Sequence, residues 1–415
     1  MSLAARLTAI QHDGRLPTVV AGVLRDGVLA ETAGVHADVG TAYRIGSITK
    51  TFTAVLVLQL RDEGRVSLDD RLDAHVPDTS YGGVSLGDLL GHTGGLQAEP
   101  TGPWWERSTG GSFAELVAAD DGTGAVAAPG EWFHYSNLGY GLLGELVARL
   151  HGASWLHVVR EQLLEPLGMS RTTWGPVAPH AQGRSVRHFT GQLDDEPHTD
   201  TGAMGPAGQL WSTVADLATW AGVLLGRRPD LLAEATAAEM RTPRLDPTYG
   251  LGLQLAELGG RSLVGHPGSM PGFQSVLFVE PDTGDGAVVL TNATTGLDVR
   301  AAVPALLADA ASDAPRVEPW IPTTSLPADV EPLLGVWFWG NTATEWRWQH
   351  DRLELRRLQV GTLTSTFVRR DDGVLVGDSG YHRGETLHVH EHHLECATFL
   401  FTRAPYDPRV FTAVR

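Results

Sequence analysis

Lysine and cysteine are almost missing from this chain of 415 residues. Cys396 is its one cysteine, and Lys50 is the single lysine among its 31 lysine and arginine residues. A lone cysteine excludes an intrachain disulfide and a zinc site built from several cysteines. Arginine keeps its proton in proteins, whereas burial can turn a lysine into a neutral amine. Because all the other lysine and arginine positions hold arginine, residue 50 is expected to need either a titratable or a compact amine.

Long apolar segments and excess positive charge are also absent. The chain has no run of 18 apolar residues, and residues 1–15 lack the apolar core of a secretion signal. The formal net charge of -18 argues against nucleic acid or an anionic membrane surface as a partner. With 42% hydrophobic and 19% charged residues, we expect a cytoplasmic, globular protein of about two or three domains.

The surroundings of Lys50 favour a catalytic role for its amine. Ser47 precedes it by three residues, so on a helix the two side chains share a face. Serine is a weak nucleophile until a base removes its proton, and Ser-x-x-Lys supplies such a base. Gly46 and the apolar residues 52–58 predict that Ser47 begins a buried helix, whose positive end favours an oxyanion. An ordinary helix with a chance Ser-x-x-Lys is the alternative, because the pattern is short.

The strand and helix patterns before residue 312 predict an α+β fold. An Asp-Gly pair at residues 26–27 separates two apolar runs and predicts a β-hairpin ahead of the Ser47 helix. Amphipathic helices follow, and strands return near residue 249. This order predicts one antiparallel sheet flanked by helices, together with an all-helical lobe. The expected strands are 17–24, 27–34, 249–256, 261–266, 273–280 and 286–292, and the expected helices are 137–151, 154–165, 213–225 and 298–310.

A proline-rich segment divides the chain. It predicts a catalytic domain over residues 1–312, a linker over 313–330 and a second domain over 331–415. The second domain has short apolar runs separated by turn residues, which predict a small antiparallel barrel or sandwich. Four tryptophans of this domain could wall one side of a substrate cleft: Trp337, Trp339, Trp346 and Trp348.

Tyr135 and Asn137 form a second candidate stretch, at the start of the helix expected near residue 138. The simple interpretation is a packed aromatic side chain and a helix N-cap. In the functional interpretation, Tyr135 exchanges a proton with Ser47 if nearby cations lower its pKa. Asn137 would then donate a hydrogen bond to a substrate carbonyl.

His266 opens a third stretch, followed by Pro267 and Gly268, which alone is an ordinary turn. If its strand borders the Ser47 cleft, His266 places a polar or cationic group opposite Lys50. The backbone N–H groups of Ser47 and Ser269 would then form an oxyanion hole.

The three stretches, 47–50, 135–137 and 266–268, resemble in order and spacing the three motifs of the penicillin-recognising serine hydrolases. The branch contains class C β-lactamases, D-alanyl-D-alanine carboxypeptidases, D-aminopeptidases, related esterases and penicillin-binding-protein-type thioesterases. The resemblance covers about residues 10–310 and is supported by stretches at 89–96, 165–169 and 205–210. The domain after residue 330 is similar to the lipocalin-like barrels that some members carry.

The resemblance assigns roles to the motif residues. It implies that Ser47 is the nucleophile that becomes acylated and that Lys50 with Tyr135 is its proton relay. It also implies that His266 stands where other members have lysine, which favours the peptidase and esterase side over β-lactamase. The implied substrate-binding residues are Asn137, Gly268 and Ser269. Pro267 lacks the N–H and hydroxyl that can hold a substrate carboxylate, so strict carboxypeptidase activity is not expected.

We therefore expect a serine acyl-enzyme hydrolase or acyltransferase that acts on a small peptide-like substrate. The bond is an amide, ester or thioester next to a D-configured residue, and no cofactor is expected. One version is a D-specific peptidase or esterase. The other is a thioesterase that releases and macrocyclises a nonribosomal peptide, delivered as a thioester or on a carrier protein. The alternative outside catalysis is a β-lactam-binding or scaffold module.

A rival site lies near the C-terminus. His388, His390 and His392 alternate, so on a strand they share one face, as metal ligands can. Histidines on the solvent face of an edge strand are the commoner explanation, and we expect no metal site.

Overall fold

The computed structural model describes residues 2–308 and 317–405. The chain divides into two compact units, one of residues 1–185 and 195–320 and the other of residues 186–194 and 321–415. Part of the expected linker, residues 313–316, lies outside the described residues. The sequence patterns gave no sign that residues 186–194 would join the second unit. Each unit is described by itself below.

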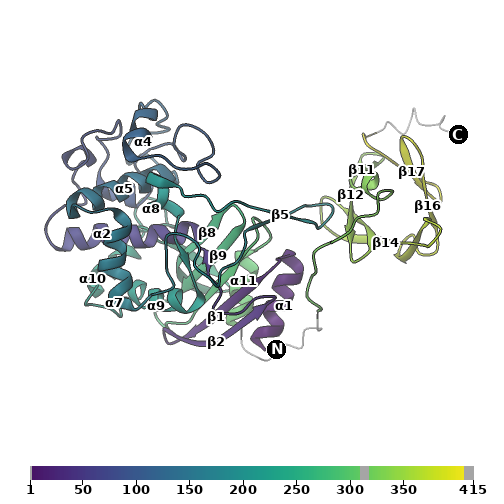
Figure 1. The fold of residues 1–415 in the computed structure, drawn as a ribbon, viewed down its shortest axis with the longest axis horizontal. Coiled ribbons are helices and arrows are strands. Elements are labelled where there is room, and N and C mark those ends of the chain that lie inside the picture. Colours follow the sequence, from purple (N-terminus) through teal and green to yellow (C-terminus); the bar gives the residue numbers. More distant parts are fainter. Residues whose placement is uncertain (1, 309–316, 406–415) are drawn as a thin grey trace. The chain divides into compact units, whose positions relative to one another are not determined.

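An antiparallel sheet of six strands forms the centre of the first unit (Figure 1). The two strands of the predicted N-terminal hairpin pair with four strands from the end of the unit, so the chain closes on itself in this sheet. The α+β prediction is confirmed. In sheet order the strands are β2 (Val28–Val35), β1 (Val19–Arg25), β10 (Gly286–Thr291), β9 (Phe273–Val279), β8 (Arg261–Met270) and β7 (Gln254–Leu258).

Helices cover both faces of this sheet. On one face, α1 (Leu3–Gly14) and α11 (Val299–Leu307) bury apolar side chains against the strands. On the other, α9 (Val214–Leu224) lies between the sheet and the helical lobe. The sequence patterns did not predict α1, which Ser2 caps and which buries Leu3 and Leu7 four residues apart. Such a short apolar face is a weak signal until the sheet is present.

The helical lobe surrounds α2 (Thr49–Asp62), which is buried along most of its length. Apolar side chains on every side of a helix are typical of a central helix in a large core. Its neighbour α5 (Asn137–His151) is equally apolar. The remaining helices of the unit are α3 (Leu86–Leu90), α4 (Phe113–Ala119), α6 (Trp155–Val159), α7 (Glu165–Leu167), α8 (Gly205–Gly208) and α10 (Glu234–Met240). Two small sheets pair β3 (Tyr43–Arg44) with β6 (Trp211–Ser212), and β4 (Arg184–Val186) with β5 (Leu193–Asp195).

The second unit contains a closed antiparallel barrel of eight strands. Closure occurs because the first strand pairs with both the second and the last. The sequence predicts a last strand over residues 396–403, and the structure has one there over residues 399–402. A further strand, over residues 393–396, was not expected, and the chain turns after it at Ala397, whose φ is 51°. The strands are β11 (Gly335–Trp339), β12 (Thr342–Gln349), β13 (Arg352–Arg357), β14 (Leu363–Arg369), β15 (Leu375–Gly380), β16 (Thr386–Val389), β17 (His393–Cys396) and β18 (Phe399–Thr402).

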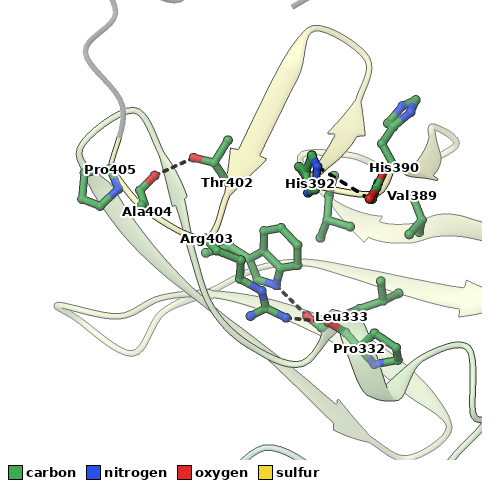
Figure 2. A pocket seen from close by; sticks show the side chains of 12 residues that line it. Pro332, Leu333, Val389, His390, His392, Thr402, Arg403, Ala404 and Pro405 are labelled. Carbon is green, nitrogen blue, oxygen red and sulfur yellow. Dashed lines mark hydrogen bonds and ion pairs between the residues drawn. The ribbon is translucent and has the colours of Figure 1, made fainter.

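The tryptophans of the barrel mostly fill its interior. Trp337, Trp346 and Trp348 are buried in the barrel core, and only Trp339 is largely exposed. Trp339 is thus the one of the four with a side chain open enough to line a cleft, and the expectation that one or another of them walls the substrate cleft stays a prediction. Beside Trp337, whose ring packs on the guanidinium of Arg403 at 3.8 Å, lies an open pocket of about 570 Å³ (Figure 2).

The connection between the units is fixed to the first one by a tryptophan. Trp320 is buried, and its backbone exchanges two hydrogen bonds with the amide of Gln11 on α1, at 2.7 and 2.8 Å. In the second unit, residues 186–194 contribute backbone hydrogen bonds to the later chain, from Thr323 N–H to Gly191 and from Trp348 N–H to Phe189. In the described part of the chain, no helix is long and apolar enough to cross a membrane.

Candidate active site

Ser47 lies in a single helical turn, Gly46–Ile48, and α2 begins just after it at Thr49. The turn fits closely against β8 because two glycines remove side chains at the contact. A Cβ on Gly46, whose φ is +51°, would lie 2.6 Å from the amide nitrogen of Ser269. A Cβ on Gly268 would lie 1.9 Å from the carbonyl oxygen of Ile45. This fit brings the Ser269 amide beside the nucleophile's backbone, where the sequence placed an oxyanion hole.

Lys50 lies one turn along α2 from Ser47, and its amine is fully buried. Its Nζ donates to Ser47 Oγ at 3.0 Å, to Asn137 Oδ1 at 2.6 Å and to the Ala207 carbonyl at 2.7 Å. Burial lowers the pKa of Lys50 to about 7, although the negative charges of Glu99 and Glu106 oppose this shift. A large fraction of Lys50 is therefore neutral at neutral pH, which makes it competent to accept the Ser47 proton.

Asn137 is held from both ends of its amide. Its Oδ1 accepts from Lys50, and its Nδ2 donates to Glu99 Oε1 at 2.8 Å. The other oxygen of Glu99 accepts from Trp105 Nε1 at 2.5 Å. One N–H of Asn137 is left over for a substrate carbonyl. Glu99 was not among the predicted site residues, and its loop position carries no motif that would have identified it.

Tyr135 is close to Lys50, but its surroundings favour the protonated phenol and not the phenolate that a base requires. Its hydroxyl is buried and has no hydrogen-bond partner among the described residues. Burial raises the pKa of Tyr135, and this exceeds the lowering by its neighbour Ser47. The condition that nearby cations lower this pKa is thus not met. Tyr135 keeps its proton, so it suits donation to a leaving group.

His266 lies at the end of a hydrogen-bond chain whose direction is fixed by the backbone. The N–H of Ser136 donates to His92 Nδ1 at 3.0 Å, so the ring proton of His92 must be on Nε2. That proton faces the Tyr249 hydroxyl at 3.2 Å, and Tyr249 in turn donates to His266 Nε2 at 3.1 Å. His266 then carries its own proton on Nδ1, 2.6 Å from the Pro267 carbonyl. Both rings are therefore neutral and each has one defined tautomer.

The electrostatics of His266 agree with this hydrogen-bond pattern. Burial and then the charge of Lys50 lower its pKa to about 3. Burial likewise lowers the pKa of His92 well below its usual range. Of the two roles expected for His266, polar or cationic, the structure supports only the polar one. The physical reason is that a second cation beside buried Lys50 would be unsolvated and repelled.

The cleft in front of Ser47 is a cavity of about 380 Å³ with a neutral lining. Ser47, Tyr135 and His266 form one part of its wall, and apolar and amide side chains form much of the rest. The lining contains no aspartate, glutamate, lysine or arginine among the described residues. Groups of side chains with metal-ligand spacing occur, in the described part of the chain, only in the second unit.

Comparison with known proteins agrees with this geometry. Residues 3–312 match the Beta-lactamase family, and residues 326–403 match a domain of unknown function, DUF7586. Penicillin-binding protein 4 of Amycolatopsis lactamdurans is 30% identical over 315 residues, which are 68% of this chain and 79% of that protein. The chain belongs to the Beta-lactamase family, and it is a serine hydrolase of that superfamily.

Two solved structures extend the comparison to the fold. A D-stereospecific amidohydrolase from Streptomyces sp. is 27% identical, with a TM-score of 0.62 over 71% of this chain and 96% of the other. SurE is 26% identical, with a TM-score of 0.64 over 97% of this chain and 98% of the other. SurE has also been solved with D-Leu. The likeness to the amidohydrolase is confined to about the length of the first unit, whereas the likeness to SurE extends over both.

Proposed function

We propose that the protein hydrolyses an uncharged amide or ester bond next to a D-configured residue, through an acyl-enzyme on Ser47. The single observation that carries this is the buried Lys50 amine, 3.0 Å from Ser47 Oγ, with a pKa lowered to about 7. Neutral Lys50 takes the hydroxyl proton while Ser47 Oγ attacks the substrate carbonyl. The N–H groups of Ser47 and Ser269 receive the oxyanion, Tyr135 supplies a proton to the leaving group, and the proton on Lys50 passes to Tyr135 to replace it. Water then releases the acyl group.

The neutral cleft supports the choice of an uncharged substrate. A free carboxylate on the leaving group needs a cation or several N–H donors, because burying it unpaired is costly. The lining has no cation, and Pro267 has no N–H to offer. An amide, ester or thioester of a small peptide-like molecule avoids this cost. The D-configuration is supported by the likeness to a D-stereospecific amidohydrolase and to SurE, which has been solved with D-Leu.

A matched substrate panel tests this function. The panel contains the amide and methyl ester of D-Leu and L-Leu, and a D-Ala-D-Ala peptide with a free or amidated C-terminus. We expect the D-Leu amide or ester to be hydrolysed faster than the corresponding L-Leu compound. We also expect the peptide with the amidated C-terminus to be hydrolysed faster than the one with a free carboxylate. Preference for the L-compounds, or for the free carboxylate, would contradict the proposal. Ser47→Ala is the control for background hydrolysis.

Acyl transfer to an amine is a second candidate, favoured by the likeness to SurE over both units. In this version the substrate is a peptide thioester, free or on a carrier protein, and an amine of the peptide replaces water. A linear peptide thioester ending in a D-residue, followed by mass spectrometry, separates the two: hydrolysis adds water, whereas cyclisation does not. Failure to label Ser47 with a fluorophosphonate or a β-lactam, seen as no increase in intact mass, would instead favour a binding module.

A further inference from the structure

The hairpin of β16 and β17 gathers histidines on one face. His388 lies opposite Glu395, and the next pair on that face is His390 and His393, joined by the backbone hydrogen bond from His390 N–H to His393 at 3.0 Å. Side chains alternate along a strand, so these four residues share the outer face. The intervening Leu387, Leu394 and Cys396 are buried in the barrel, which fixes the register. The residues on the outer face of the hairpin are therefore His388, His390, His393 and Glu395.

The geometry of the outer face brings three possible ligand atoms together. The rings of His390 and His393 are stacked, with centroids 4.3 Å apart and planes 14° apart. His390 Nε2 lies 3.4 Å from Glu395 Oε2. One ligand atom from each of the three residues lies within 4.8 Å of the other two. Since zinc binds nitrogen and oxygen at about 2.0–2.2 Å, two ligands of one ion lie about 3–4 Å apart, so only small side-chain rotations are needed.

The cluster is also open to ions from solvent. His390 and Glu395 remain accessible, with 44% and 41% of their side chains exposed. His390 is one of the residues that line the pocket beside Trp337, and in Figure 2 its ring extends away from Leu333 and Arg403 on the other side of that pocket.

We propose that this face binds one divalent transition-metal ion through His390, His393 and Glu395. Two imidazoles and one carboxylate suit zinc, nickel or copper, whereas magnesium and calcium prefer oxygen ligands throughout. The remaining positions of the ion face water. The ion joins the two strands across their turn. The ligand set differs from the His388, His390 and His392 considered from the sequence, because His392 lies in the turn rather than on the strand face.

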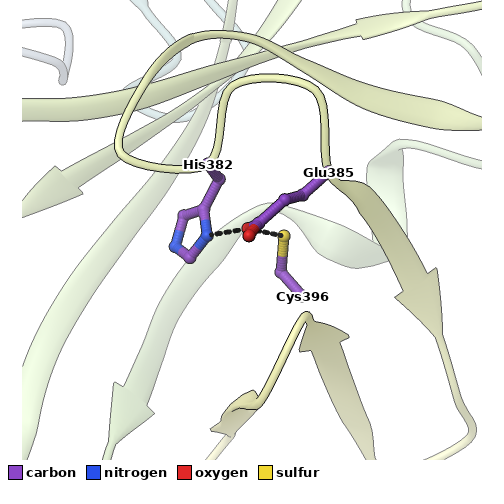
Figure 3. Close-up of side chains that lie close together, drawn as sticks. All are labelled: His382, Glu385 and Cys396. Carbon is purple, nitrogen blue, oxygen red and sulfur yellow. Dashed lines mark hydrogen bonds and ion pairs between the residues drawn. The ribbon is translucent and has the colours of Figure 1, made fainter.

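The barrel contains a second cluster of possible metal ligands, which can be compared with the one on the hairpin. His382, Glu385 and Cys396 also have metal-ligand spacing (Figure 3). However, Glu385 Oε2 already accepts from His382 Nδ1 at 2.8 Å and from the Cys396 thiol at 3.6 Å. Burial raises the pKa of Cys396 to about 12, so the thiol keeps its proton. These polar groups satisfy one another inside the barrel, and Cys396 serves as a control position.

Calorimetric titration of ZnCl₂ into the full-length, untagged protein, stripped of metal with a chelator, tests the proposal. We expect one site that His390→Ala or His393→Ala weakens by more than about tenfold, as loss of a ligand should. His392→Ala and Cys396→Ser, which leave the proposed ligands in place, should bind as the wild type does. Circular dichroism verifies that each variant is folded.

Cobalt(II) absorption provides the second measurement and identifies the ligands. The expected spectrum has ligand-field bands without a thiolate charge-transfer band, and it weakens in His390→Ala. Three results would overturn the proposal: no zinc binding by the wild type at about 100 μM, a zinc affinity in His390→Ala and His393→Ala equal to that of the wild type, or a thiolate band that Cys396→Ser removes.

Discussion

The histidines of the two units differ in burial and in hydrogen bonding. In the first unit, His92 and His266 are buried, and a backbone N–H and a backbone carbonyl at the two ends of their chain fix every proton. In the barrel, His390 and His393 lie near the surface with their rings stacked on one another. The first pair can position its neighbours but cannot take up a proton. The second pair is open to solvent and to an ion. A histidine whose two ring nitrogens are buried and hydrogen-bonded thus has a structural role. A histidine whose ring nitrogens are accessible can serve as a metal ligand.

The comparison also explains why we assign the role of the base at Ser47 to a lysine and not to a histidine. Burial lowers the pKa of both His266 and Lys50, but their usual values differ by several units. The pKa of His266 reaches about 3, which leaves its ring neutral and its lone pair engaged by Tyr249. The pKa of Lys50 reaches about 7, close to the working pH of a general base. The following predictions test this division of roles.

Ser47→Ala should have the largest effect, a complete loss of turnover and of labelling by a fluorophosphonate. The nucleophile is removed, while the fold keeps its packing, because the side chain is only partly buried. Ester hydrolysis and intact mass measure the loss, and a thermal melt checks the fold. A folded variant with turnover above about 1% of wild type would reject Ser47 as the nucleophile.

Lys50→Arg should lower the acylation rate of Ser47 by about 10²–10⁴, the usual cost of losing a general base. The guanidinium keeps the positive charge but cannot become a neutral acceptor near pH 7. Stopped-flow acylation by a reactive ester measures the effect. Since the amine is buried, circular dichroism and a thermal melt are needed beside it. A folded variant within a few-fold of wild type would show that Lys50 acts only as a fixed charge.

The pH dependence should show the pKa of Lys50 and not that of His266. Neutral Lys50 is the active form, so acylation should fall about tenfold per pH unit below about pH 7 and level off above it. His266, with a pKa of about 3, should not titrate between pH 5 and 9. Acylation rates across this range, with a substrate that does not ionise, provide the measurement. A pH-independent rate, or an inflection that His266→Gln moves while the fold is kept, would contradict the assignment.

Tyr249→Phe should have the smallest effect on rate, a several-fold loss of acylation. The hydroxyl joins His92 to His266, and its removal leaves two buried ring nitrogens without partners, which costs about 1–3 kcal/mol of unfolding free energy. Nitrogen-15 spectra of labelled histidines should show defined tautomers in the wild type and their loss in the variant. Tyr43→Phe is the matched control, because its buried hydroxyl is hydrogen-bonded to the Thr18 hydroxyl, at 2.9 Å, instead. Identical histidine spectra in Tyr249→Phe and the wild type would refute the directed chain.

Much of the catalytic unit could be predicted from the sequence, because its signals are local. The hairpin at residues 26–27, the helix α5 and the four returning strands follow from short-range patterns, with shifts of a few residues. The Ser47 and Lys50 pair needed only helical spacing. The helix α1 was missed because its apolar face is short, and the barrel strand β17 was missed because only Leu394 and Cys396 of its four residues are apolar.

The sequence by itself determined which residues we propose for the chemistry: a single lysine three residues after a serine, and the Tyr135 and His266 stretches. Only the tertiary structure decided their protonation. Burial brings the pKa of Lys50 to about 7, keeps the proton on Tyr135 and leaves His266 neutral. Glu99 and Tyr249 join the site from loops distant in the chain. Proton affinity depends on the solvation and charges around a group, which the folded chain creates and a motif does not contain.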